Sequence, residues 1–167
     1  NFDRRFEAPQ AQQIVRGMAE AMNYRGPDMD GYWSSGDNLC HLGHKRLSII
    51  DLSEGGRQPM LDESGRFVIV FNGEIYNFRE LRDKLAESGV NFRSKSDTEV
   101  LLKGYIKYGA ALFQQLDGMF ALAIYDTQQK TMVLARDRAG EKPRYYRSEP
   151  GLFIFGSELH TLTKVPD

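Results

Sequence analysis

Apolar side chains recur at helical spacing in three segments of the chain, namely residues 9–23, 78–88 and 97–108. Pro9 suits the first turn of the first segment, because proline fits the start of a helix. Asn77 precedes the second segment as a candidate N-cap, and Gly89 follows that segment. Asp97, together with the serine before it, is a candidate cap for the third. The pattern therefore predicts three main helices.

Between the helices, short apolar runs bounded by glycine, proline or polar turn residues predict β-strands. These strands are residues 31–35, 38–50, 66–71, 119–125, 131–136, 144–147 and 152–155. Shorter helical stretches are predicted after Gly109 and over residues 157–162. Adjacent strands joined by tight turns favour antiparallel sheets, and the helices are grouped rather than alternating strictly with strands. The chain is therefore predicted to be an α+β domain, with no linker long enough to divide it.

The composition narrows the classes of function. The 167-residue chain carries a formal charge of −1, which gives no electrostatic reason to expect nucleic acid or an anionic membrane as a partner. Its apolar runs are too short for a transmembrane helix, and no secretory signal opens it. The single cysteine, Cys40, argues against a disulfide framework, so we expect a reducing, cytoplasmic setting. The three histidines have no partners at zinc-ligand spacing, so no metal site is predicted.

The most informative polar residues follow the apolar run of residues 67–71. Asn72 offers a side-chain N–H₂ group, Gly73 an unencumbered backbone N–H and Glu74 a carboxylate. Two converging N–H donors can stabilise an oxyanion, and a carboxylate can hold an ammonium group. Asn-Gly is also the commonest hairpin signal, so a type I′ turn, with Glu74 as an ordinary turn carboxylate, is the alternative.

Two further charged residues, Arg46 and Asp97, are candidates for binding a charged ligand. Arg46 is followed directly by the apolar run of residues 47–50, and a guanidinium fork binds a carboxylate through two parallel hydrogen bonds. The alternative for Arg46 is a structural ion pair with Asp51 or another core carboxylate. Asp97 can accept hydrogen bonds from an ammonium group, or it can serve as an ordinary N-cap. With Glu74, these residues match the charged groups of an amino acid.

Three motifs then occur in the order found in one family, namely Arg-Leu-Ser-Ile from Arg46, Asn-Gly-Glu-Ile-Tyr-Asn from Asn72 and Ser-Asp-Thr-Glu around Asp97. With them, the chain resembles the glutaminase domain of asparagine synthetases, a class II glutamine amidotransferase, from about residue 23 to residue 162. Glucosamine-phosphate synthases and phosphoribosyl amidotransferases carry Arg-Trp-Ala or Arg-Tyr-Ser in place of Arg-Leu-Ser. The resemblance implies an N-terminal-nucleophile hydrolase fold, a four-layer α/β/β/α sandwich of antiparallel sheets.

The resemblance also implies a role for each candidate residue. Arg46 binds the carboxylate of glutamine, while Glu74 and Asp97 bind its ammonium group. Asn72 and Gly73 form the oxyanion hole.

Other matching motifs lie outside this set. The Arg-Gly-Pro-Asp loop of residues 25–28 resembles a family loop near the nucleophile, although a simple turn would also explain it. Gln-Pro-Met at residues 58–60 and the matches at residues 117–121 and 134–138 are interpreted as scaffold.

The family's nucleophile is the thiol of an N-terminal cysteine, whose own α-amine acts as the base. This chain begins with Asn1, and Cys40 lies in a predicted strand with no free amine beside it. Cys40 is interpreted as part of the core, and a pair with His44 is rejected because the strand spacing exceeds hydrogen-bond reach. Asn1 resembles the first residue after a lost opening strand. The alternative to a glutaminase is a catalytically silent module that binds glutamine or docks a partner.

The resemblance implies partners beyond this chain. Residues 1–167 correspond to one glutamine amidotransferase domain that lacks its N-terminal strand. That domain hydrolyses glutamine to glutamate and ammonia for a C-terminal ATP-dependent synthetase domain, which is absent from this chain. ATP and Mg²⁺ are expected only in the synthetase domain, and no cofactor is expected in this one. The sequence does not name the ammonia acceptor, aspartate or another carboxylate, and it leaves open whether the chain forms a homodimer.

Overall fold

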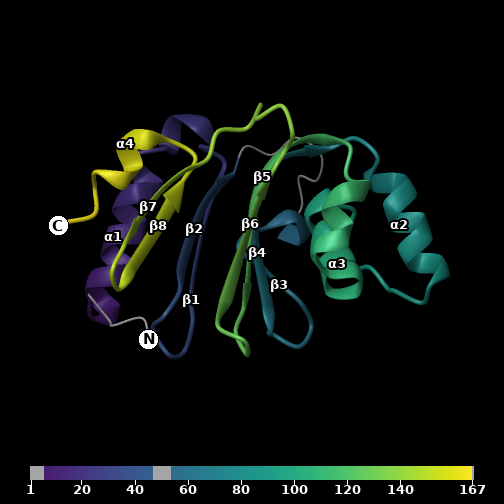
Figure 1. The fold of residues 1–167 in the computed structure, drawn as a ribbon, viewed down its shortest axis with the longest axis horizontal. Coiled ribbons are helices and arrows are strands. Elements are labelled where there is room, and N and C mark those ends of the chain that lie inside the picture. Colours follow the sequence, from purple (N-terminus) through teal and green to yellow (C-terminus); the bar gives the residue numbers. More distant parts are fainter. Residues whose placement is uncertain (1–5, 47–53, 167) are drawn as a thin grey trace. The chain divides into compact units, whose positions relative to one another are not determined.

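The structure, a computed structural model, describes residues 6–46 and 54–166 (Figure 1). The chain divides into two compact units, one of residues 1–47 with 143–167 and one of residues 48–142. Both units combine helices with antiparallel sheets, as the sequence predicts. Among the described residues, none of the helices is both long and apolar enough to span a bilayer.

The first unit combines short helices with two β-hairpins. Its elements are α1 (Ala8–Glu20), η1 (Asn23–Arg25), β1 (Met29–Ser34), β2 (His41–Arg46), β7 (Tyr145–Glu149), β8 (Leu152–Gly156) and α4 (Leu159–Leu162). β1 pairs with β2, and β7 with β8, both antiparallel. α1 packs closely on β2 at Gly43, where an added Cβ would lie 2.9 Å from Val15 Cγ1. The core of this unit joins Met18 of α1 with Ile154 and Leu162.

The second unit is a four-stranded antiparallel sheet with two helices packed on one face (Figure 1). Its elements are η2 (Glu54–Gly56), β3 (Met60–Leu61), β4 (Phe67–Ile75), α2 (Phe78–Glu87), α3 (Asp97–Tyr108), η3 (Gly109–Gln115), β5 (Gly118–Asp126) and β6 (Thr131–Arg136). The strand order is β3-β4-β5-β6. Phe71 and Ile75 of β4 share a core with Leu81 and Leu85 of α2 and Leu101 of α3. Burying each such side chain contributes about 1.5–3 kcal/mol, which holds the helices against β4.

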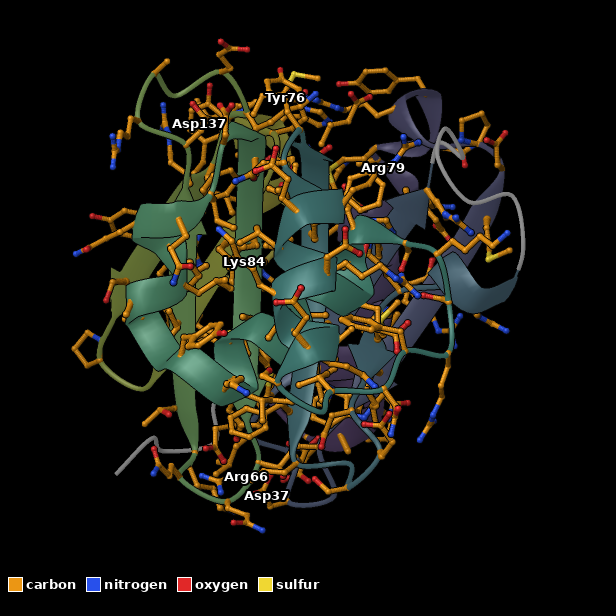
Figure 2. The ribbon with its side chains drawn as sticks, turned by 90° about the vertical axis from the view of Figure 1, so that its right-hand side faces the viewer. Asp37, Arg66, Tyr76, Arg79, Lys84 and Asp137 are labelled. Atoms are coloured by element: carbon orange, nitrogen blue, oxygen red, sulfur yellow. The ribbon has the colours of Figure 1, made fainter. Side chains whose placement is uncertain are left out.

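Strand β4 runs between two polar ends of this unit. Figure 2 shows Arg66 at one end and Tyr76 with Asp137 at the other. Arg66, just before β4, pairs with Asp126 (Nη2–Oδ2 2.6 Å). Tyr76 follows the last residue of β4. The candidate residues 72–74 therefore lie toward the Tyr76 end.

Most helices and strands lie where the sequence predicts them, and α3 and β6 have the predicted bounds. The clearest difference is β4, which was expected to end at Phe71 and continues to Ile75, because β5 pairs with it along its whole length. β2 begins at His41 rather than at residue 38, and residues 47–50 of that predicted strand lie outside the described residues. β3 was not predicted, since two residues are too few to show a pattern.

Two predicted helix caps also differ. Asn77 occupies the N-cap position of α2 but does not cap it. Its side chain instead donates to Gln115 O (2.9 Å) and accepts from Asp117 N (3.1 Å). In α3 the cap is Ser96, whose Oγ accepts from Glu99 N at 3.3 Å, and Asp97 is the first helical residue. The side chain of Asp97 is therefore not used as the N-cap.

Candidate functional site

The direction of the Gly73 N–H group follows from the pairing of β4 with β5. Gly73 stands opposite Phe120. Phe120 N donates to Asp137 Oδ2 (3.2 Å), and Asp137 N donates to Phe120 O (2.8 Å), so both backbone groups of Phe120 point away from β4. Opposite residues in an antiparallel ladder either exchange both hydrogen bonds or both point away from each other. The N–H of Gly73 therefore points away from β5, toward the other edge of β4.

On that edge of β4, the neighbouring backbone groups are already bound. Phe71 N donates to Gln58 Oε1 (2.6 Å), and Gln58 Nε2 donates to Phe71 O (3.1 Å). Ile75 N donates to Asp97 Oδ2 (3.3 Å). Between these two contacts, no described residue accepts a hydrogen bond from Gly73 N. The edge of β4 therefore presents an available donor between two occupied ones.

The backbone at Gly73 admits only glycine. Its φ of +149° is a conformation that side chains disfavour, and an added Cβ would lie 2.1 Å from Met119 O of β5. Asn72 and Gly73 lie inside a paired strand, so the alternative of a type I′ turn at Asn-Gly, with Glu74 as a turn carboxylate, is wrong. Close approach of β5, rather than a turn, explains the glycine.

The side chains of Asn72 and Glu74 point to the face of the sheet opposite the helices. Successive side chains of a strand alternate between faces, and Phe71 and Ile75 belong to the core beneath α2 and α3. Both polar side chains are half-buried. Neither forms a hydrogen bond or ion pair with another described residue. An amide and a carboxylate are thus available on one face, beside the edge that carries the N–H of Gly73.

Asp97 contributes a buried carboxylate to the same edge of β4. It is only 5% exposed, and its contact with Ile75 places it two residues along the strand from Gly73. Burial raises the pKa of Asp97, and the nearby Glu74 adds to that effect, although backbone N–H groups of Ile75 and Thr98 act against it. Within the described part of the chain, no cation pairs with Asp97. A positively charged ligand group would relieve this excess negative charge.

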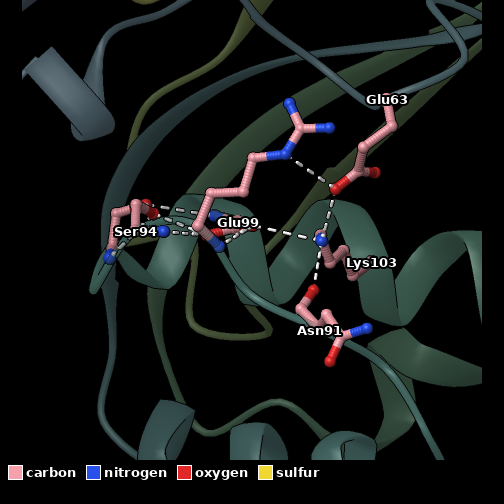
Figure 3. Close-up of polar contacts among 7 residues, drawn as sticks. Glu63, Asn91, Ser94, Glu99 and Lys103 are labelled. Atoms are coloured by element: carbon pink, nitrogen blue, oxygen red, sulfur yellow. Dashed lines mark hydrogen bonds and ion pairs between the residues drawn. The ribbon is translucent and has the colours of Figure 1, made fainter.

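The loop before Asp97 is held by Glu99, two residues further along the same motif (Figure 3). The Glu99 carboxylate accepts hydrogen bonds from Arg93 N (2.9 Å) and from the N and Oγ of Ser94 (both 2.7 Å). Lys103 Nζ lies 3.2 Å from Glu99 and 2.7 Å from Glu63. Burial opposes ionisation of Glu99, but these hydrogen bonds outweigh it and lower its pKa. The negative charge of Glu99 is therefore balanced by partners within the fold, unlike that of Asp97.

Arg46 belongs to the first unit, as the last residue of β2, and is only 8% exposed. The Arg-Gly-Pro-Asp loop packs against it: Asp28 N donates to Arg46 O (3.1 Å), and a Cβ on Gly26 would lie 2.5 Å from the carbonyl carbon of Lys45. The loop thus fixes the backbone that carries this guanidinium. Asp51, its alternative partner, lies outside the described residues.

Cys40 is a core residue, as its place in an apolar strand predicts. It is 6% exposed and lies just before β2, and burial raises the pKa of its thiol to about 12. A thiol that stays protonated is a poor nucleophile. The described residues also contain no group of three acidic, histidine or cysteine side chains that could hold a metal ion.

In the second unit, the structure brings together four of the five predicted site residues, namely Asn72, Gly73, Glu74 and Asp97. It adds Gln58, which was predicted to be part of the scaffold. Gln58 is 7% exposed and holds the backbone next to Asn72. A buried glutamine before a proline gives no sequence signal of its partner, so only the fold could reveal this contact.

Among solved structures, the fold is similar to that of the glutamine phosphoribosylpyrophosphate amidotransferase from Bacillus subtilis complexed with ADP and GMP. The TM-score is 0.76 at 20% identity, covering 92% of this chain and 40% of that one. This likeness, together with the helices and antiparallel sheets described above, confirms the predicted α+β fold class.

Curated relatives are similar over most of this chain. It is 40% identical over 160 residues to asparagine synthetase [glutamine-hydrolyzing] 3 of Bacillus subtilis, covering 95% of this chain and 26% of the relative. It is 36% identical over 179 residues to putative asparagine synthetase [glutamine-hydrolyzing] 2 of Methanocaldococcus jannaschii, covering 98% and 34%. The chain thus spans about a quarter to a third of these relatives. Residues 4–167 match the model of the glutamine amidotransferase domain, and the chain belongs to that family.

Proposed function

We propose that this domain hydrolyses the side-chain amide of glutamine, giving glutamate and ammonia. The observation that carries the proposal is the N–H of Gly73, held on the edge of β4 between the contacts of Phe71 and Ile75 and without an acceptor among the described residues. An amide carbonyl that is attacked becomes an oxyanion, which needs donors fixed in advance. Gly73 N–H and the Asn72 side chain supply two such donors.

The charged groups of glutamine find complementary partners in the candidate residues. Asp97 and Glu74 bind the α-ammonium group, because a cation offsets the cost of the buried carboxylate of Asp97. Arg46 binds the α-carboxylate through its guanidinium fork. These ion pairs are equally strong in the ground state and in the transition state. They therefore affect KM rather than kcat.

The chemistry divides between the described donors and a thiol expected N-terminal to Asn1, as the family resemblance implies. The thiolate attacks the amide carbon, and the oxyanion forms against Asn72 and Gly73. The C–N bond then breaks, ammonia leaves with a proton from the α-amine of that cysteine, and water hydrolyses the thioester to glutamate. One oxyanion donor contributes about 3–4 kcal/mol to such a step.

The ammonia is proposed to serve an amidation in a further domain, as the names of the relatives suggest for those proteins. Aspartate is the acceptor that we favour, with asparagine as the product.

The test is ammonia release from glutamine by the full-length protein, with and without ATP and aspartate. Release that depends on glutamine supports the proposal, and asparagine formed only when all three are present identifies the acceptor. Tight glutamine binding without release would favour the silent module, and neither binding nor release would contradict both. Arg46→Ala should raise KM for glutamine with little change in kcat, and an unchanged KM would contradict its role.

A further inference from the structure

Gln58 connects the two segments that carry the site. Its Nε2 donates to Phe71 O (3.1 Å) on β4 and to Thr98 Oγ1 (3.3 Å) in the first turn of α3, while its Oε1 accepts from Phe71 N (2.6 Å). All three residues are buried, with exposures of 7% for Gln58, 5% for Phe71 and 3% for Thr98. Both N–H bonds of the amide and its carbonyl are therefore in use.

The side chain of Gln58 takes the place of a backbone pair. β3 pairs with β4 through Met60 opposite Ile69, and Gln58 and Phe71 each lie two residues beyond that pair along their segments. At that position the side-chain amide, with a carbonyl and an N–H like those of a peptide, forms both hydrogen bonds with Phe71. Its second N–H is then available for Thr98, which a backbone amide could not reach.

These two contacts lie next to the candidate site on both sides. Phe71 immediately precedes the oxyanion donors Asn72 and Gly73, and Thr98 immediately follows Asp97. The donors and the carboxylate are also joined at one point by Ile75 N to Asp97 Oδ2 (3.3 Å). Gln58 supplies the second point of attachment between strand and helix, and two points fix both separation and angle.

We propose that Gln58 is a positioning residue that sets the distance between the oxyanion donors and the ammonium-binding carboxylate of Asp97. The inference rests on the proposed function, because it is the reaction on glutamine that gives this distance a meaning. Glutamine has its ammonium group and its amide at opposite ends, so both ends must meet their partners at once. A change in spacing therefore affects KM and kcat together.

The amide is chemically specific for this task. A carboxylate in its place would set an oxygen against Phe71 O and lose the donor to Thr98. A methionine keeps a similar length but forms none of the three hydrogen bonds, which leaves Phe71 N and O without these partners in a buried place. Gln58→Met thus tests loss of the hydrogen bonds alone. Gln58→Glu adds repulsion between its carboxylate and Phe71 O.

Asn77 provides a matched control within the same unit. Its amide also joins two distant segments, through Gln115 O (2.9 Å) and Asp117 N (3.1 Å), but neither partner adjoins a site residue. Asn77→Leu removes a more exposed amide bridge, so it measures the structural effect of losing such a bridge away from the site. A positioning role of Gln58 predicts that Gln58→Met is much less active than Asn77→Leu.

The experiment measures glutamine hydrolysis and thermal unfolding of the full-length wild type, Gln58→Met, Gln58→Glu and Asn77→Leu below their unfolding temperatures. We expect kcat/KM to fall on the order of 10- to 100-fold in Gln58→Met, with both constants changed, and further in Gln58→Glu. Asn77→Leu should stay within about twofold of wild type even if its unfolding temperature falls. An active wild type with equally active Gln58→Met overturns the inference.

Two further arms cover a Gln58 variant that does not fold. Thr98→Val removes only the contact of Gln58 to α3 and should raise KM. Thr98→Ser keeps the hydroxyl and should have the KM of the wild type. Equal KM values in these two variants overturn the inference as well. A wild type that neither binds nor hydrolyses glutamine overturns the proposed function. The proposed role of Gln58 is then overturned as well.

Discussion

Asp97 accepts a hydrogen bond from the backbone N–H of Ile75 at 3.3 Å, so a carboxylate at the start of helix α3 is attached directly to the edge of strand β4. The contact places the Asn-Gly-Glu and Ser-Asp-Thr-Glu motifs side by side although more than twenty residues separate them. The contact uses one oxygen of Asp97, and no cation pairs with the carboxylate among the described residues. The arrangement is suited to a ligand with a positive charge.

The first prediction concerns the stability cost of Asp97. Burial raises its pKa, so the folded protein binds this proton more tightly than the unfolded chain does. The ionised carboxylate therefore lowers stability above the folded-state pKa, and this cost decreases as the pH falls below that pKa and disappears at the lower unfolded-state pKa. Asp97→Asn should raise the unfolding temperature of the ligand-free protein at pH 7 and raise KM for glutamine. Thermal unfolding at pH 4 and pH 7 checks the sign, and a variant less stable than wild type at pH 7 would be contrary to it.

The second prediction concerns the close approach of β5 at Gly73. Gly73→Ala places a Cβ 2.1 Å from Met119 O at a φ of +149°, so the strands must separate. We expect a loss of about 1–3 kcal/mol in the free energy of unfolding and a fall in kcat. Gly36→Ala is the control, because nothing lies within 4 Å of its added Cβ, and it should change stability by less than about 1 kcal/mol. Equal denaturation midpoints for the two variants would argue against the packing described.

The third prediction concerns the Asn72 side chain, which is proposed to donate to the oxyanion. Asn72→Ala removes an interaction that strengthens only as the oxyanion forms. Steady-state kinetics should therefore show kcat lower by about 10²–10³-fold with KM little changed. Glu74→Gln offers the contrast, since it changes a ground-state contact and should mainly raise KM. A near-wild-type kcat in Asn72→Ala would rule out the assigned role.

The fourth prediction concerns the acid behaviour of Asp137. Burial opposes ionisation of this carboxylate, but N–H groups of Lys142, Glu141 and Phe120 outweigh it and bring its pKa to about 2. Its stabilising effect is fully present above the unfolded-state pKa, about 3.9, and is lost as the pH falls toward 2. Asp137→Asn should lower the unfolding temperature by about 2–4 °C at pH 7 and by less near pH 2. A constant difference across that range would show that ionisation is not involved.

The elements best predicted from the sequence are those with long periodic patterns and clear boundaries. Helix α3 and strand β6 have the predicted bounds because their apolar spacing and flanking residues agree. Strand β4 extends beyond its prediction because Asn72-Gly73 has the local signature of a turn, and only the pairing with β5 decides otherwise. The glycine that favours a turn in isolation here permits close strand contact.

The candidate site was predicted as a set of residues and not as a geometry. Asn72, Glu74 and Asp97 were identified from motifs, but the direction of the Gly73 N–H depends on which residues pair across the sheet. The role of Gln58 was missed for the same reason, since its partners Phe71 and Thr98 lie 13 and 40 residues away. Long-range contacts of single polar side chains have no periodicity from which they can be inferred.

The first turn of α3 carries two acidic side chains with opposite surroundings, Glu99 saturated by Lys103 and the N–H groups of its loop, and Asp97 with its charge unbalanced among the described residues. An amino-acid ligand would supply the missing positive charge. Because such a ligand binds the folded state, it would also stabilise the fold. Bound glutamine would thereby raise the stability of the folded domain, and its concentration would set the size of that effect.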